Sequence, residues 1–382
     1  MVETEPKRPK LLFVVTNDFG ELSSALYFTM GQAFDVTVAL PPHLFALDGE
    51  HLPVSASPYQ SVGEVLAIVD RERPDAVLLF SGYLFGVNNL FSVEALSFLV
   101  SELRGRGRRV VTSDPFLGLM SHLDESVFGD ALPQKAWLTE HFGKVAETMR
   151  GIVHLYPADL QTAESHPGQS FFNEQLIITQ TERAEYENRI GRSVPLRPDK
   201  KRWMFVLSME DYGLQAGRHG RQKFDELLIR RMQETARAGR QAVLVAPKIC
   251  IDSVRQGAGG IGEAILLPFC RYDLFRMLAL DGEFVFYWNI FSNSVRARAA
   301  NDLPVVFFDT GHIAHAIPPL HRLGLQTYYG NSPLPSFPQT QALEYPSLAV
   351  LAAAQREPLA ETIAGLRRLP TPALAVERIL AR

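Results

Sequence analysis

Short apolar runs without polar alternation recur along the first half of the chain, and segments with helical periodicity separate them. Such runs span 10–16, 75–80 and 109–112. A run of this kind is typical of a parallel strand buried on both faces of its sheet. The pattern predicts a doubly wound α/β domain. Its other predicted strands are 35–40 and 151–155, with 175–179 as a candidate sixth, and its predicted helices are 22–32, 61–71 and 91–104.

The same pattern returns in the second half. Strands are predicted at 203–208, 241–246, 263–267, 283–288 and 304–308, and helices at 224–238, 272–278 and 294–300. Short crossovers return each strand directly to the same sheet. We therefore expect two doubly wound, Rossmann-like domains with parallel sheets that face a central cleft.

The limits of these domains follow from a change in composition. The segment 181–202 is charged, contains proline and lacks apolar periodicity. This is typical of a domain boundary. The interpretation gives a first domain at 1–181, a linker at 182–202 and a second domain at 203–382 that includes two terminal helices. The segment 41–60, rich in Pro, His and Ser, is expected to form a long loop.

Composition narrows the classes of function. The 382 residues are 46% hydrophobic and 21% charged, as in an ordinary globular protein. A net charge of −4 argues against nucleic-acid binding by phosphate neutralisation. The two cysteines are too few for a disulfide framework. The apolar helix at 83–100 is interrupted by Asn88, Asn89 and Glu94, so no membrane span is expected, and a cytoplasmic protein is the default.

Polar and basic residues follow the predicted strand ends of the second half. Ser292, Asn293 and Ser294 open a helix, where backbone N–H groups bind anions. Lys248 and Arg271 follow two other strands, and Arg298 lies in the same helix as the serines. Together with Arg296, these cations could stabilise a diphosphate without a metal. The alternative is that some of them face solvent.

The order of motifs in this half resembles the donor half of GT-B glycosyltransferases. The resemblance rests on the run 268–275, the Ser-Asn-Ser helix start at 292–294 and the run 301–306, followed by 309–316 in place of a glycine-rich loop. It implies a GT-B fold and a sugar donor activated by a nucleotide and bound by the second half, with His312 in the loop as a further contact. The expected ligand-binding residues are Lys248, Arg271, Ser292, Asn293, Ser294, Arg298 and His312.

The chain departs from that family at two acidic positions. Ala297 stands where many members carry a glutamate, and Asn289 stands where some members carry an earlier one. Two alternatives to a metal-independent glycosyltransferase therefore stay open. One is a degenerate member that binds a ligand or scaffolds a partner without catalysis, and the other is a GT-B-like sugar epimerase.

A general base for sugar transfer must lie close to the acceptor hydroxyl. Asp18, at the end of the first strand, is the preferred candidate, and Glu21, Asp114 and His122 are alternatives. Capping and turn roles are the common alternative for aspartate.

Two further patterns carry little chemistry. The run 257–262 matches G-x-G-x-x-G, but it precedes a strand, whereas a phosphate loop follows one. His312, His315 and His321 suggest zinc, yet no cysteine or carboxylate with ligand spacing accompanies them, and Gly311 and the prolines at 318–319 favour a loop. No metal site is predicted.

Overall fold

The computed structural model describes residues 8–16, 19–87, 90–119, 132–160, 168–257, 261–268, 270–330 and 334–382. The chain divides into two compact units. The first comprises Met1–Gln175, Arg322–Tyr328 and Ala364–Arg382, and the second comprises Leu176–His321 and Tyr329–Ile363. No helix within these ranges is both long and apolar enough to cross a membrane.

The first unit is built on a parallel sheet of seven strands in the order β3-β2-β1-β4-β5-β6-β7. The central strand β1 pairs through Leu11 with Val36 on one side and with Ala76 on the other. The strands are β1 (Lys10–Val15), β2 (Asp35–Leu40), β3 (Ser55–Pro58), β4 (Ala76–Phe80), β5 (Arg109–Ser113), β6 (Val153–Tyr156) and β7 (Gly168–Ser170).

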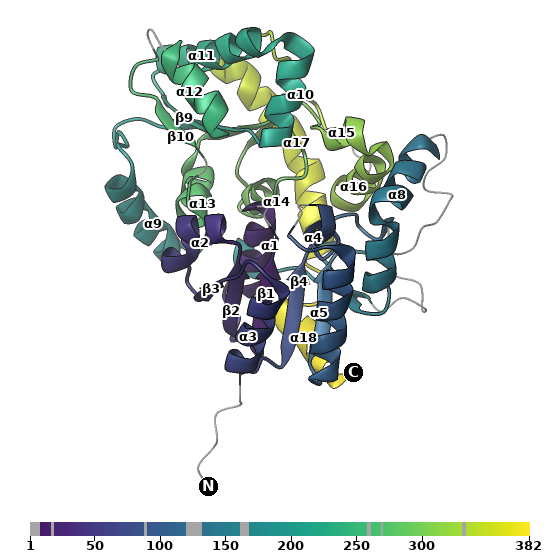
Figure 1. Cartoon of the computed structure of the whole chain (residues 1–382). Coiled ribbons are helices and arrows are strands. Elements are labelled where there is room, and N and C mark those ends of the chain that lie inside the picture. The colour runs from purple at the N-terminus through teal and green to yellow at the C-terminus, as the bar shows by residue number, and fades with distance from the viewer. Residues whose placement is uncertain are drawn as a thin grey trace. The chain divides into compact units, whose positions relative to one another are not determined.

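Helices connect these strands and cover the sheet (Figure 1). Ser61 and Ser92 cap two of them by accepting hydrogen bonds from the backbone N–H groups of Glu64 and Ala95. The helices are α1 (Phe19–Thr29), α2 (Pro42–Asp48), η1 (Gly49–His51), α3 (Val62–Glu72), α4 (Leu84–Val87), α5 (Val93–Gly105), α8 (Leu132–Met149), η2 (Glu174–Leu176, on the boundary between the units) and the C-terminal α18 (Pro372–Ala381).

The second unit holds a parallel sheet of five strands in the order β10-β9-β8-β11-β12. The strands are β8 (Arg202–Val206), β9 (Gln241–Ala246), β10 (Ile265–Pro268), β11 (Phe284–Tyr287) and β12 (Val305–Phe307). Its helices are α9 (Gln180–Ser193), α10 (Met209–His219), α11 (Arg221–Arg237), α12 (Lys248–Gln256), α13 (Tyr272–Asp281), α14 (Asn293–Ala300) and α15 (Ile313–Ala316). Two more helices are shared between the units: α16 (Pro318–Tyr329), most of which belongs to the first unit, and α17 (Tyr345–Leu366), most of which belongs to the second.

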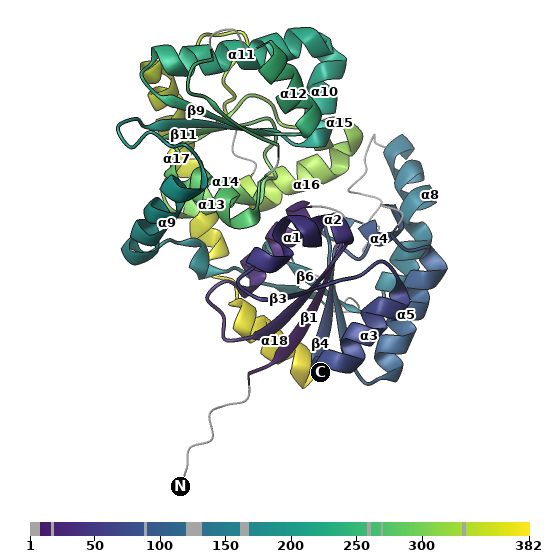
Figure 2. The same cartoon turned by 60° about the vertical axis from the view of Figure 1, so that its left-hand side comes forward.

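Helices cover both faces of this second sheet. α11 and α12 pack on one face, and α13 and α14 pack on the other (Figure 2). Burial on both faces explains why these strands read as continuous apolar runs.

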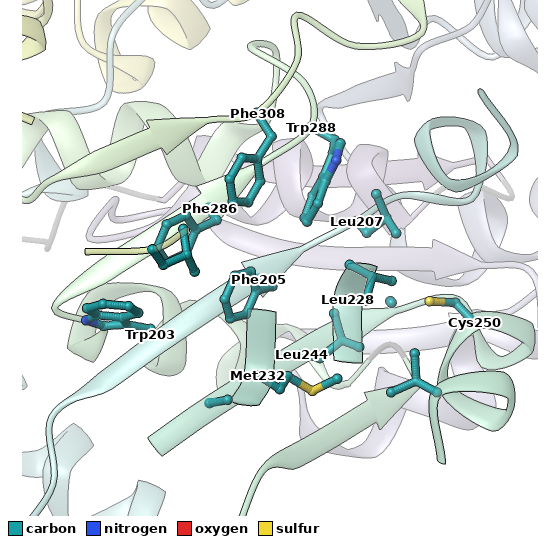
Figure 3. Packing of buried hydrophobic residues seen from close by; sticks show 14 of the residues in the cluster. Trp203, Phe205, Leu207, Leu228, Met232, Leu244, Cys250, Phe286, Trp288 and Phe308 are labelled. Atoms are coloured by element: carbon teal, nitrogen blue, oxygen red, sulfur yellow. The ribbon is translucent and has the colours of Figure 1, made fainter. Parts of the chain in front are cut away.

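An aromatic core fills the space between this sheet and α11. Alternate residues of β8 and its extension, Trp203, Phe205 and Leu207, point to the same side as Phe286 and Phe308 (Figure 3). The rings of Phe205 and Phe286 stack at 4.6 Å between their centroids. This core positions the ends of β8, β11 and β12 relative to one another.

The two doubly wound parallel sheets confirm the predicted fold class. Local details differ at the sheet edge. Residues 175–179 form no strand, and the outer strand is instead β7. The segment 41–60 holds α2, η1 and β3 rather than a loop. Short polar edge strands such as β3 and β7 carry no apolar pattern from which they could have been predicted.

The division into units also differs from the predicted limits. Part of the predicted linker lies in α9, which packs against α13 within the second unit. The chain end from Ala364, including α18, belongs to the first unit, where Phe172 N–H donates to the carbonyl of Pro370 at 2.9 Å. Buried Ala375, Val376 and Ile379 fix α18 there.

Candidate functional site

The strand order of the five-stranded sheet reverses between β8 and β11. The chain runs outward from β8 to β9 and β10, and then continues on the other side with β11 and β12. Ligands of open α/β sheets bind outside the carboxyl ends of the strands at such a reversal. We call this region the carboxyl-edge site, and we define it by residues that follow β8, β11 and β12: Ser208, Asp211, Asn289, Ser292, Ser294, Asp309 and His312.

Asp211 is the buried centre of this region. Ser208 caps α10: its Oγ accepts from the backbone N–H of Asp211 at 3.1 Å and donates to Oδ2 of the same residue at 2.8 Å. Nδ2 of Asn289 also donates to Oδ2, at 2.6 Å. The Asp211 side chain is 0% exposed. Burial alone raises the pKa of this carboxyl, but hydrogen bonds from His312 and Asn289 outweigh it and hold the pKa below its ordinary value.

The loop after β12 comes close to Asn289. Gly311 has φ +98°, and a Cβ built there would lie 2.4 Å from Cβ of Asn289. Glycine is therefore needed for both the backbone angle and the space. This approach places the backbone N–H and Nδ1 of His312 each 2.9 Å from Oδ1 of Asp211. The His312 side chain is 30% exposed.

A second polar group lies beside this pair. Asp309 Oδ2 accepts from Nε2 of Gln215 and from Nη1 of Arg218, each at 2.6 Å. Nη2 of Arg218 also contacts Nε2 of His315. Gln339 donates to Oε1 of Gln215 at 3.0 Å. Charged and amide groups thus continue along the edge from α10 to α15.

The first turn of α14 is the predicted anion-binding element. Ser292 is its N-cap residue, and the Ser292 side chain makes no capping hydrogen bond to the helix. Instead, Ser292 Oγ lies 2.8 Å from Oγ of Ser294, which accepts from the Tyr287 hydroxyl at 3.0 Å. Asn293 accepts from Arg296 through its side chain. This turn can present backbone N–H groups to an external acceptor.

Two of the predicted cations lie at the same edge. Lys248 begins α12 directly after β9 and pairs with Asp252. Arg271 is the N-cap residue of α13 after β10, and its Nη2 lies 3.3 Å from the Asp273 carboxylate. Both side chains reach solvent and could turn towards an anionic ligand.

Arg298 lies elsewhere, and its predicted contact with phosphate does not fit its position. Its side chain is fully buried. Nε donates to the carbonyl of Pro304 at 2.7 Å, and Nη1 donates to the carbonyls of Ala279 and Gly282. These carbonyls precede β12 and β11, so the guanidinium is at the amino-terminal edge of the sheet. Burial lowers its pKa to about 10. We therefore leave Arg298 out of the carboxyl-edge site.

Comparison with solved structures identifies the fold, whereas comparison of sequences finds no relative. No protein-family model matches the sequence, and no curated protein matches it. The structure is similar to spinosyn rhamnosyltransferase SpnG, with a TM-score of 0.52 and 12% identity over 98% of this chain and 100% of that chain. It is also similar to UGT2 of Phytolacca americana complexed with UDP-2fluoro-glucose and pterostilbene, with a TM-score of 0.52 and 10% identity over 98% of this chain and 99% of that chain.

A third similar structure is the UDP-GlcNAc 2-epimerase from Neisseria meningitidis bound to UDP-GlcNAc, with a TM-score of 0.54 and 13% identity over 98% of this chain and 100% of that chain. The chain has the GT-B fold. This confirms the fold that the sequence resemblance implied. At such low identity the likeness concerns the fold alone.

At positions 297 and 289, where the sequence resemblance implies a glutamate, this chain has residues with other contacts. Ala297 is buried, with 2% of its surface exposed. The Asn289 amide makes two hydrogen bonds: its Nδ2 donates to Asp211, and its Oδ1 accepts from the backbone N–H of Phe291 at 3.1 Å. In this GT-B chain the buried carboxylate at the edge comes from α10 instead.

The predicted base in the first unit, Asp18, lies outside the described residues, as does its alternative His122. Glu21 lies in the first turn of α1. Asp114 is 3% exposed and accepts from the backbone N–H groups of Phe116 and Gly118 at 2.8 and 2.9 Å. This is the turn role that the sequence left open.

The three histidines considered for zinc have different surroundings. His312 pairs with Asp211, His315 contacts Arg218, and His321 packs edge-on against Phe291. Within the described part of the chain, no group of His, Cys, Asp or Glu could hold a metal. His312 is nevertheless the N-cap residue of a short helix, α15, which contains His315, where a loop was expected.

A cavity of about 350 Å³ opens at the opposite, amino-terminal edge of the second sheet. Its lining includes Arg202, Lys201, Asp281 and Glu283. Arg202 pairs with Asp281, and Lys201 pairs with Glu283 at 3.1 Å. Arg183 and Lys200 also line the cavity, which lies away from the carboxyl-edge site.

Sequence reasoning missed Asp211, together with Gln215, Arg218 and the whole of α10. A local signal existed. Ser208-Met209-Glu210-Asp211 directly follows an apolar strand, and serine three residues before an acidic residue is a helix-start signature.

Proposed function

We propose that the protein is a metal-independent glycosyltransferase that binds a nucleotide-activated sugar at the carboxyl-edge site of its second unit. The main support is the position of this site: the uncapped first turn of α14 and the buried Asp211 lie where the strand order reverses in a GT-B fold. Helix starts and strand-order reversals both favour phosphate-bearing ligands.

The donor diphosphate would lie against the backbone of Ser292, Asn293 and Ser294, the two serine hydroxyls and the Asn293 amide. Lys248 and Arg271 would supply positive charge from the neighbouring strand ends. A charge-assisted hydrogen bond of this kind contributes about 1.5–3 kcal/mol. Breaking the weak local ion pairs of these exposed cations costs little in comparison.

In the transfer itself, the bond between the anomeric carbon and the diphosphate oxygen breaks while an acceptor oxygen bonds to that carbon. The diphosphate leaves with the electron pair, and cations and N–H groups at the site stabilise its charge. A base takes the proton of the acceptor hydroxyl. Asp18 remains our proposal for that base.

The test is a calorimetric titration with uridine, thymidine, guanosine, adenosine and cytidine diphosphates. We expect one of them to bind, and the double variant Ser292→Ala, Asn293→Ala to bind it at least about tenfold more weakly. Ser170→Ala, at the edge of the other sheet, is the control. Binding of none of these nucleotides to the unmodified protein would overturn the proposal.

A sugar-nucleotide epimerase is the second candidate, because the epimerase structure is as similar as the transferase structures. The two reactions give different products. An epimerase converts UDP-GlcNAc into an isomer of equal mass, whereas a transferase releases a nucleoside diphosphate. Product analysis by mass spectrometry and NMR separates them, and nucleotide binding without any turnover would indicate a non-catalytic protein.

A further inference from the structure

Asp211 of α10 and His312, the N-cap residue of α15, are far apart in sequence and meet at the carboxyl-edge site, where the Asp211 side chain is fully buried. We propose that Asp211 is a positioning residue: it fixes the ring of His312 so that Nε2–H donates to a phosphate oxygen of the bound nucleoside diphosphate. This inference rests on the proposed function, and it adds a residue that the sequence resemblance did not supply.

The orientation of the ring follows from its partner. An ionised carboxylate only accepts hydrogen bonds, so the contact of 2.9 Å requires a hydrogen on Nδ1 of His312. The backbone N–H of His312 binds the same Oδ1 and restricts the ring further. Ser208 and Asn289 hold the other oxygen, which prevents the carboxylate from rotating. The Nε2 edge of the ring is therefore directed away from Asp211.

The burial of the two side chains differs. Asp211 is 0% exposed and His312 is 30% exposed, so the carboxylate lies beneath a ring that reaches the surface. In a doubly protonated ring Nε2 also donates a hydrogen bond. Asn289 links this pair to the loop that leads into α14, because its Oδ1 accepts from Phe291. Asn289 thus contacts both the carboxylate that holds the His312 ring and the loop before the first turn of α14, where we propose that phosphate binds.

Other ionisable groups surround the ring on the elements that pack here. They are Arg218 of α10, Asp309 of the loop after β12 and His315 of α15. Arg218 pairs with Asp309 at 2.6 Å and also contacts His315. Of the described residues, Asp211 bonds directly to His312.

The experiment has two readouts. The first is nitrogen NMR of the histidine rings in the ligand-free protein, with the His312 signal assigned by its loss in His312→Gln. We expect a ring with hydrogen on Nδ1. The second is calorimetric affinity for the nucleoside diphosphate identified above, between about pH 6.5 and 9, where histidine loses its charge.

We expect affinity to fall as pH rises through the deprotonation of the ring. His312→Gln should weaken binding about tenfold or more and remove the pH dependence. Asp211→Asn should move the midpoint of the pH dependence to lower pH. Since Asp211 is buried and its variant could unfold, His312→Gln, at a partly exposed position, carries the test alone if needed. His315→Gln, on the same short helix, is the matched control.

Outcomes separate the two proposals. If the unmodified protein binds no nucleoside diphosphate, the proposed function fails and this inference falls with it. If the nucleotide binds but His312→Gln matches the unmodified protein in affinity and pH profile, only the role of His312 is overturned. A ring with hydrogen on Nε2 alone in the free protein would overturn the role of Asp211.

Discussion

Nη1 of Arg298 donates a hydrogen bond of 3.0 Å to the backbone carbonyl of Gly282, the residue that ends α13 before β11. The same guanidinium binds the carbonyl of Pro304 ahead of β12. A positive charge at the carboxyl end of a helix also interacts favourably with its dipole. Arg298 therefore joins one helix end to the starts of two strands.

We expect Arg298→Ala to destabilise the protein because it leaves several buried carbonyls without a donor. The loss should be at least about 2 kcal/mol, which corresponds to roughly 4–8 °C in melting temperature for a unit of this size. Thermal denaturation measures it. Arg296→Ala is the control, since the Arg296 guanidinium contacts Asn293 at the partly exposed start of α14. Equal melting temperatures for Arg298→Ala and the native protein would contradict a structural role.

Gly311→Ala should displace the loop after β12. The new Cβ would lie within 2.4 Å of Asn289, and the backbone angle would be strained. We expect a lower melting temperature together with a change in the His312 ring signal, because the bond to Asp211 depends on this loop. Gly213→Ala is the matched control: it lies inside α10 with open space around it, so it should stabilise by about 0.5–1 kcal/mol. Unchanged ring signals in Gly311→Ala would contradict the expected coupling.

Acid should weaken the second unit through Asp211. Its pKa in the folded protein lies below the ordinary value of 3.8, so its contribution to stability is complete above that value and is lost as pH falls through the folded pKa. Asp211→Asn should be less stable than the native protein at neutral pH, and the difference should shrink in acid. Urea denaturation at a series of pH values measures both. A difference that stays constant down to strong acid would contradict the lowered pKa.

Lys248→Ala and Arg271→Ala should each weaken nucleoside diphosphate binding, by about tenfold if the charge contacts a phosphate. The effect should diminish at high salt, which screens partly exposed charges. Their melting temperatures should change little, because the Lys248 pair is largely exposed and the Arg271 pair is a partly exposed local contact. Lys223→Ala, an exposed change on α11, serves as the control. Native-like affinity in both variants would exclude these cations from the site.

A chelator should leave nucleotide binding and any turnover unchanged. In the proposed transfer, protein cations and backbone N–H groups take the role that a divalent ion plays in other phosphate sites. The measurement is affinity and product formation with and without EDTA, followed by re-addition of Mg²⁺. Activity that disappears with EDTA and returns with Mg²⁺ would contradict metal independence.

The sequence by itself determined the two sheets. Strands such as β1 and β9 are buried on both faces, so their sequences are apolar throughout. This local pattern is visible in the sequence and predicts such strands. The start of α14 was also predictable, because serine and asparagine are favoured at helix starts by interactions with neighbouring backbone groups. The sequence did not reveal β3 and β7, because short edge strands bury too little to impose an apolar pattern.

Only the tertiary structure decided which polar residues meet. Arg298 follows the serines of α14 within the same helix, yet its side chain extends to the opposite edge of the sheet, where backbone carbonyls accept its hydrogen bonds. Asp211 and His312 are 101 residues apart, and their contact depends on the strand order and on a glycine that lets two loops touch. Residue types and their local spacing show which positions of a helix or strand are buried. The pairing of distant side chains is set by how the strands are ordered, and local sequence does not encode that order.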